Sequence, residues 1–85
     1  MSRLIPATER IILARELIRK AREFPLPTEG GKYDFSYIAQ VKDLLRQARD
    51  LVKFIPQTAG ASAEIKTEAT KIKLEADQAD REILH

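Results

Sequence analysis

The side chains that most often carry catalysis or bind metals are scarce in this sequence. It contains no cysteine, and its one histidine, His85, is the last residue. A zinc site built without these two residue types needs mostly carboxylates, which is rare. The serines Ser2, Ser36 and Ser62 each stand near the start of a predicted helix, where capping accounts for them. We therefore predict no catalytic residue, no metal site, no cofactor and no small-molecule substrate.

One glycine-rich stretch has part of the pattern of a phosphate-binding loop. It reads Thr28-Glu29-Gly30-Gly31-Lys32-Tyr33. A phosphate loop follows a strand and has the pattern G-x-x-x-x-G-K-[ST], in which the last hydroxyl binds magnesium. Tyr33 occupies that last position here, and no alternating strand pattern precedes the stretch. These features indicate a turn between two helices.

Basic residues recur at helical spacing in two parts of the chain, and this is the clearest chemical pattern in the sequence. If the two parts form an antiparallel helical hairpin, both rows come to the same side of it, which we name the basic edge. Cations along a helix suffice to bind a phosphate backbone, so the basic edge is a candidate site for RNA, DNA or an acidic helix. The basic edge consists of Arg15, Arg19, Arg22, Lys42, Arg46, Arg49 and Lys53.

The elements that carry these rows are set by proline and glycine, which interrupt the chain near residue 6, at 25–31 and at 56–60. Between them, apolar residues recur with the period of an amphipathic helix. We predict helices over about 7–24, 35–54 and 62–83, with Asp34 or Ser36 capping the second and Ser62 the third. The predicted fold is a single all-α domain, residues 1–85, that forms a three-helix bundle.

The third predicted helix has a narrower apolar stripe than the other two. Its spacing is that of a coiled-coil heptad, and half of its members are alanine, so it allows close approach but buries little area. We name this stripe the assembly seam. It consists of Ile65, Ala69, Ile72, Ala76, Ala79 and Ile83.

Charged residues flank this seam on both sides. Glu68, Glu75 and Glu82 follow one side at intervals of seven, and Lys66 and Lys73 follow the other. In heptad lettering these are the g and e positions, which select partners and orientation in coiled coils. Two arrangements are open. The helix packs in cis, with its glutamates facing part of the basic edge, or it packs in trans against another chain.

Aromatic residues argue against binding to bases. Phe24, Tyr33, Phe35, Tyr37 and Phe54 cluster near predicted helix ends rather than among the cations. A stacking platform for single strands interleaves aromatic and basic side chains. We expect these five to pack in the core at the ends of the hairpin. The connection over 25–33 is also longer than the turn of about three or four residues in a helix-turn-helix motif.

The layout of the chain is similar to that of microtubule-interacting-and-transport (MIT) domains. The residues that carry this resemblance are Gly31-Lys32-Tyr33 and the stretch from Ile38 to Leu51. The proline-rich Pro25–Pro27 departs from that pattern. The resemblance implies a helical bundle that binds a partner helix in a groove.

Bulk composition leaves the class of function broad. The net charge is +2 with a pI near 9.1, a mild indication of an anionic partner. No run approaches the roughly 18 apolar residues of a membrane span, and no signal-peptide pattern opens the chain, so we expect a cytoplasmic protein. We predict a non-enzymatic helical module that binds another protein or a second copy of itself. The alternative is nucleic-acid binding through the basic edge. Ile12 and Leu74, apolar residues on polar faces, favour self-association slightly.

Overall fold

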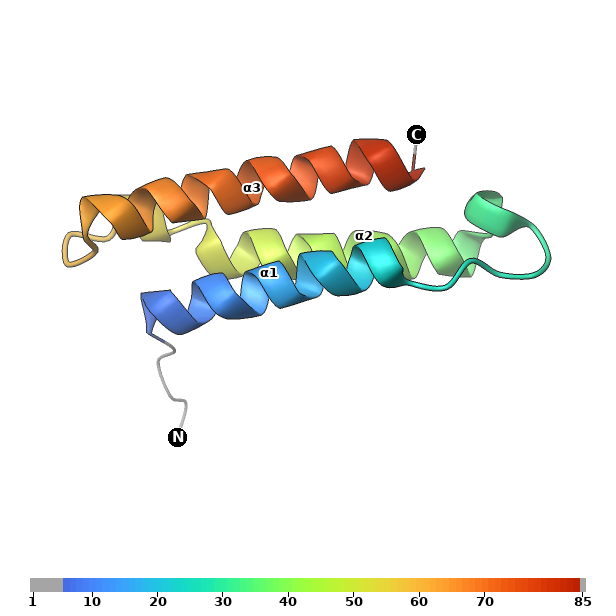
Figure 1. Cartoon of the computed structure of the whole chain (residues 1–85), viewed down its shortest axis with the longest axis horizontal. Coiled ribbons are helices and arrows are strands. Elements are labelled where there is room, and N and C mark those ends of the chain that lie inside the picture. Colours follow the sequence, from blue (N-terminus) through green and yellow to red (C-terminus); the bar gives the residue numbers. More distant parts are fainter. Residues whose placement is uncertain (1–5, 85) are drawn as a thin grey trace.

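The computed structural model describes residues 6–84, which form three α-helices and two short 3-10 turns (Figure 1). Helix α1 spans Ala7–Glu23, α2 spans Phe35–Val52 and α3 spans Ala63–Leu84. The turn η1 (Gly31–Tyr33) precedes α2, and η2 (Ile55–Gln57) follows it. No strand occurs in this part of the chain. The predicted all-α three-helix bundle is confirmed.

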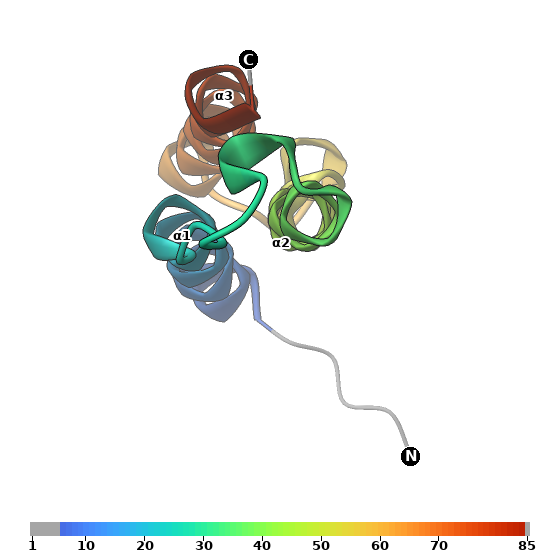
Figure 2. The same cartoon turned by 90° about the vertical axis from the view of Figure 1, so that its right-hand side faces the viewer.

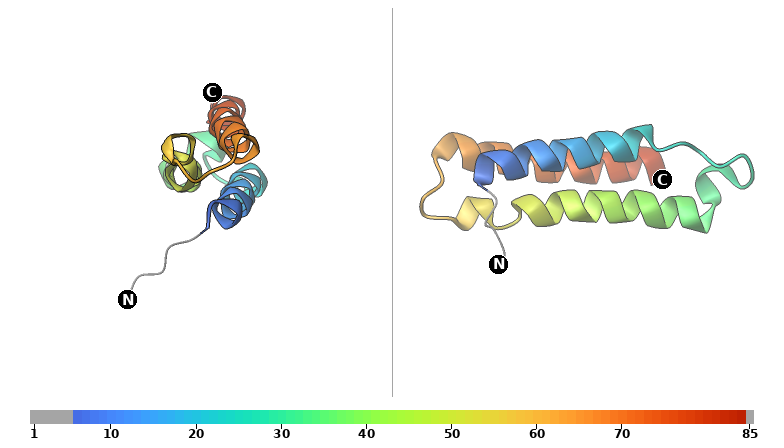
Figure 3. Two further views of the ribbon diagram at one scale, coloured as in Figure 1. Left: turned by 90° about the vertical axis from the view of Figure 1, so that its left-hand side faces the viewer. Right: turned by 90° about the horizontal axis from the view of Figure 1, so that it is seen from below.

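The helices alternate in direction. The chain runs along the bundle in α1, returns in α2 and runs forward again in α3, so α1 and α3 are parallel (Figures 1 and 3). Viewed along its axis, the bundle is a triangle in which each helix contacts the other two (Figure 2). The third helix therefore packs in cis onto the α1–α2 hairpin.

Local sequence signals account for where the helices begin and end. Phe24 is extended and ends α1, because the residue before a proline is pushed out of the helical region. Asp34 caps α2 by accepting a hydrogen bond of 2.9 Å from the amide of Tyr37. Ser62 accepts one of 3.2 Å from the amide of Ile65 at the start of α3. Helix α2 ends at Val52, two residues before the predicted Phe54, and η2 with its proline follows.

The core lies along the centre of this triangle and is entirely apolar among the described residues. Its largest fully buried side chains are Val41, Leu45 and Val52 from α2 and Ile72 from α3. Four members of the assembly seam are buried, and Ile65 and Ile83 are partly buried at its ends. Because alanine supplies much of this stripe, α3 can lie close to the hairpin.

The prediction that all five aromatics pack in the core is wrong for three of them. Phe24 and Tyr37 do contact each other at the hairpin end, with ring centroids 5.9 Å apart. Tyr33, Phe35 and Phe54 are instead 76%, 89% and 64% exposed. Phe35 is the first residue of α2 and precedes Tyr37, the first buried residue of that helix. Tyr33 and Phe54 lie outside the α-helices, so the helical period does not set the direction of their side chains.

Candidate functional site

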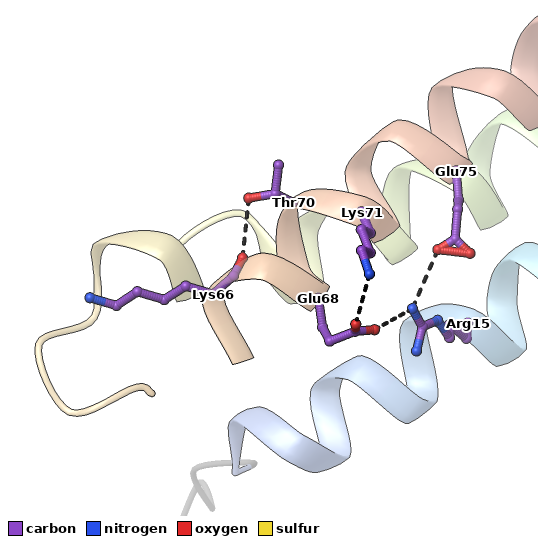
Figure 4. Close-up of polar contacts among 6 residues, drawn as sticks. All are labelled: Arg15, Lys66, Glu68, Thr70, Lys71 and Glu75. Atoms are coloured by element: carbon purple, nitrogen blue, oxygen red, sulfur yellow. Dashed lines mark hydrogen bonds and ion pairs between the residues drawn. The ribbon is translucent and has the colours of Figure 1, made fainter. Parts of the chain in front are cut away.

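Arg15 and Arg22, on the α1 part of the basic edge, face α3. Arg15 Nη2 lies 2.6 Å from Glu68 Oε2 and 3.6 Å from Glu75 Oε2 (Figure 4). Arg22 Nη1 lies 2.7 Å from Glu82 Oε1. All three glutamates of the predicted g positions therefore face cations of α1. Pairs of this kind are expected between parallel helices, where g positions of one helix meet e positions of the other.

Of the basic residues on the α2 part of the basic edge, one contacts α3 and the others do not. Arg49 Nη1 donates a 3.1 Å hydrogen bond to Asp77 Oδ1 of α3. Arg46 and Lys53 contact carboxylates of their own helix, namely Asp43 and Asp50. Lys42 is exposed and has no carboxylate within salt-bridge distance among residues 6–84. Helix α3 thus covers part of the basic edge, as in the cis arrangement, which is one of the two that the sequence left open.

Arg19, the remaining residue of the basic edge, forms ion pairs with carboxylates of its own helix, α1. It pairs with Glu16 at 2.6 Å and Glu23 at 3.0 Å, one turn away on either side. Its hydrogen bonds lower the pKa of Glu16 below the ordinary value, and those of Arg46 do the same for the pKa of Asp43. These contacts leave the basic edge mostly neutralised within the chain.

The ion pairs between α1 and α3 also shift the pKa values of the groups that form them. The hydrogen bond from Arg15 lowers the pKa of Glu68, and that from Arg22 lowers the pKa of Glu82. The hydrogen bond from Arg15 to Glu68 in turn raises the pKa of Arg15, although partial burial opposes this. Oε2 of Glu75 is a buried oxygen without a hydrogen bond in the described chain, because its distance from Arg15 exceeds hydrogen-bond length.

A second surface lies on the opposite flank of the hairpin. At 100° per residue, Leu17 is about 200° around α1 from Arg15, and Leu51 is about 200° around α2 from Arg49. Since Arg15 and Arg49 face α3, the two leucines lie on the side of the hairpin away from it. Both are half-buried. We name this surface the hairpin groove.

Two rows of side chains at alternating intervals of three and four residues run along the groove, one on each helix. Asp43 and Asp50 flank the second row on α2. The first row is Arg10, Leu13, Leu17, Lys20 and Phe24, and the second is Gln40, Leu44, Gln47, Leu51 and Phe54.

Three hollows follow the length of the groove. The middle one, of about 350 Å³, lies between Leu17 and Leu51 and is flanked by Arg10, Gln47 and Asp50. A second, of about 280 Å³, shares Arg10, Asp50 and Leu51 with it and extends to Phe54 and η2. The third, of about 270 Å³, lies at the other end beside Phe24 and Leu44. The groove is apolar at its base and polar at its margins.

The hairpin groove was not predicted from the sequence, although a signal for it was present. Leu13, Leu17, Leu44 and Leu51 belong to the helical pattern of apolar residues in the sequence. They give each of the first two helices about three apolar positions per heptad in place of two. The bundle core uses two of them. Leu13 is 43% exposed, and Leu17, Leu44 and Leu51 are only partly covered. Ile12 and Leu74 are exposed on outward faces as expected, at 64% and 61%, but neither lines a hollow described above.

The described residues offer little for other chemistry. Residues 6–84 contain no group of three or more histidines, cysteines or carboxylates placed to hold a metal ion. Over the same range, no helix is both long and apolar enough to cross a membrane. His85 lies outside the described residues.

Comparisons with protein-family models, with curated proteins and with solved structures found no match to this chain. The resemblance to MIT domains is therefore not supported by a family match.

Proposed function

We propose that this chain is a non-enzymatic helical module of the cytoplasm that binds another protein chain, and that its binding surface is the hairpin groove. One observation carries the proposal: Leu13, Leu17, Leu44 and Leu51 are only partly covered on the side of the hairpin away from α3. Exposed apolar surfaces bordered by polar residues mark interaction sites more often than isolated exposed residues do. The groove combines such a surface with hollows that side chains can enter.

An amphipathic helix fits this surface. The hollows extend from Ala39 to Phe54 along the α2 side of the hairpin, about 22 Å at 1.5 Å per residue, which is about four turns of a partner helix. A helix that enters a groove uses apolar anchors at i, i+3 or i+4, and i+7. Such a partner would lie between α1 and α2 and extend the bundle to four helices, with the groove leucines becoming core residues.

The experiment compares two exposed leucines of the same chain. Leu13→Lys places a charge beside the groove, and Leu74→Lys places the same charge on the outward face of α3. We expect proteins retained by the tagged native chain and by Leu74→Lys to be lost from Leu13→Lys, with unchanged circular dichroism in all three. Equal retention by Leu13→Lys and the native chain contradicts the proposed binding surface.

Nucleic-acid binding through the basic edge is the alternative, and it makes a separate prediction. Phosphates would have to displace Glu68, Glu82 and Asp77 or compete with carboxylates of the same helix. We expect no retardation of DNA or RNA at about 50 mM salt, where phosphate contacts are strong. If the native chain retards DNA or RNA and the double variant Arg46→Glu with Arg49→Glu does not, nucleic-acid binding through the basic edge is favoured.

A further inference from the structure

We propose that residues 24–27, which we name the proline segment, are a ligand for a small domain whose groove is lined by aromatic side chains. The segment reads Phe-Pro-Leu-Pro and lies in the connection between α1 and η1, at one end of the bundle (Figure 1). Its exposed residues, Pro25 and Leu26, line none of the hollows of the hairpin groove. This inference therefore goes beyond the proposed function and does not rest on it.

The sequence of the proline segment favours the polyproline II conformation. Phe24 has φ −61° and ψ 126°, within the range of that conformation. The rings of Pro25 and Pro27 fix φ at about −65°, and each proline moves the residue before it out of the helical region. Pro25 alone is enough to end α1. The second proline restricts two further residues, Leu26 and Pro27, to extended backbone.

Burial along the proline segment follows the turn of a polyproline II helix, which has three residues. Phe24 and Pro27, three residues apart, are half-buried, and Phe24 packs on the ring of Tyr37. Pro25 and Leu26 between them are exposed, Leu26 at 61%. One side of the turn is thus anchored on the bundle. The other two sides present a proline ring and a leucine side chain to solvent.

The backbone groups of the proline segment select the kind of partner. The amide of Phe24 donates to the carbonyl oxygen of Ala21, and the two prolines have no N–H. No backbone–backbone hydrogen bond within residues 6–84 involves residues 25–28. A β-strand partner needs N–H groups at regular intervals, which this segment lacks. The segment therefore offers apolar surface and carbonyl acceptors, with Leu26 as its one remaining amide donor.

A groove lined by aromatic side chains is the complement of such a ligand. Flat rings pack against proline and leucine, while Trp N–H and Tyr O–H groups donate to carbonyl oxygens. SH3 and WW domains bind proline-rich segments in grooves of this kind, and they gain affinity because the polyproline II conformation is already formed. Anchoring of Phe24 on the bundle adds to this order in the present chain.

The chain contains no tryptophan, so the fluorescence of a tryptophan in the partner reports binding directly. Purified SH3 and WW domains, chosen for a tryptophan in the groove, are titrated with the full native chain. We expect a saturable change in fluorescence for at least one domain. Leu26→Asp should weaken that binding about tenfold or more, because it places a charge against the rings. Leu74→Asp is the matched control, since Leu26 and Leu74 are each 61% exposed, and it should bind as the native chain does.

A second variant tests the conformation of the segment. Pro25→Ala frees φ at an exposed position and restores an N–H, so it should also weaken binding. Native affinity in Pro25→Ala would show that the partner reads only an apolar side chain, which overturns the proposal. Unchanged fluorescence in every domain, or equal weakening by Leu26→Asp and Leu74→Asp, overturns it as well. Leu13→Lys should leave this binding intact, so the proposed function and this inference can fail separately.

Discussion

The two flanks of α1 show how one helix can hold a neighbour inside the chain and leave room for another. On the flank toward α3, Arg15 and Arg22 find glutamates within the same chain. On the flank toward the groove, Leu13 and Leu17 lack full cover. The charged flank is therefore satisfied within a single chain, whereas the apolar flank is only partly covered by residues 6–84.

This difference separates the contacts that orient α3 from the contacts that attach it to the hairpin. The ion pairs between α1 and α3 are exposed, with 44% of the Arg15 side chain and 34% of the Glu68 side chain accessible. Exposed pairs contribute about 0–1 kcal/mol each, so they set the register of α3 more than they hold it. Burial of Ile72 and of the seam alanines supplies most of the attachment.

The largest expected effect comes from removing that burial. Ile72 is fully buried and is the largest α3 side chain in the core. We expect Ile72→Ala to lower the free energy of unfolding by about 2–5 kcal/mol, because it leaves a cavity where α3 meets the hairpin. Urea denaturation followed by circular dichroism measures the loss.

Leu74→Ala, on the outward face of the same helix, is the matched control for this change. Leu74 is 61% exposed, so its truncation should alter the urea midpoint only slightly. Similar losses for both variants would show that the attachment of α3 does not depend on its buried stripe.

The sequence predicted the helices because each signal is local. The proline after Phe24 and the caps at Asp34 and Ser62 act within one turn of the helix ends they define. Helical periodicity likewise identified the buried stripe of α3 before any contact was known. Heptad positions placed Glu68 where it could face the basic edge, but they left open whether the third helix packs in cis or in trans.

The remaining features depend on how the helices pack, which local signals do not determine. The apolar faces of α1 and α2 include Leu17 and Leu51, but which part of each face stays open depends on the side that α3 covers. The exposure of Phe35 and Phe54 likewise follows from their positions at or beyond the ends of α2. Helical periodicity predicts which way a side chain points within a helix, but it makes no prediction for a residue outside the helix.

A smaller effect is expected from reversing one charge on the flank toward α3. Arg15→Glu places a third carboxylate beside Glu68 and Glu75, and we expect it to destabilise the protein by about 1 kcal/mol or less after solvent screening. Adding Glu68→Arg restores one opposite-charge contact and should recover part of the loss. Urea denaturation of the native chain, both single variants and the double variant gives the coupling between the two positions. Strictly additive losses would show that the contact contributes nothing to stability.

The smallest expected effect is a loss of stability in acid that depends on the same flank. Because the folded state lowers the pKa of Glu68 and Glu82 below the ordinary 4.5, it binds fewer protons there than the unfolded state. Their stabilisation is thus present above pH 4.5 and is lost as the pH falls through the lowered values. Urea midpoints measured from about pH 6 to about pH 3 should fall in acid, and less steeply in Arg15→Gln with Arg22→Gln. That variant keeps a residual slope, because Glu16 and Asp43 retain their partners on α1 and α2. An unchanged slope would place the acid sensitivity outside the flank toward α3.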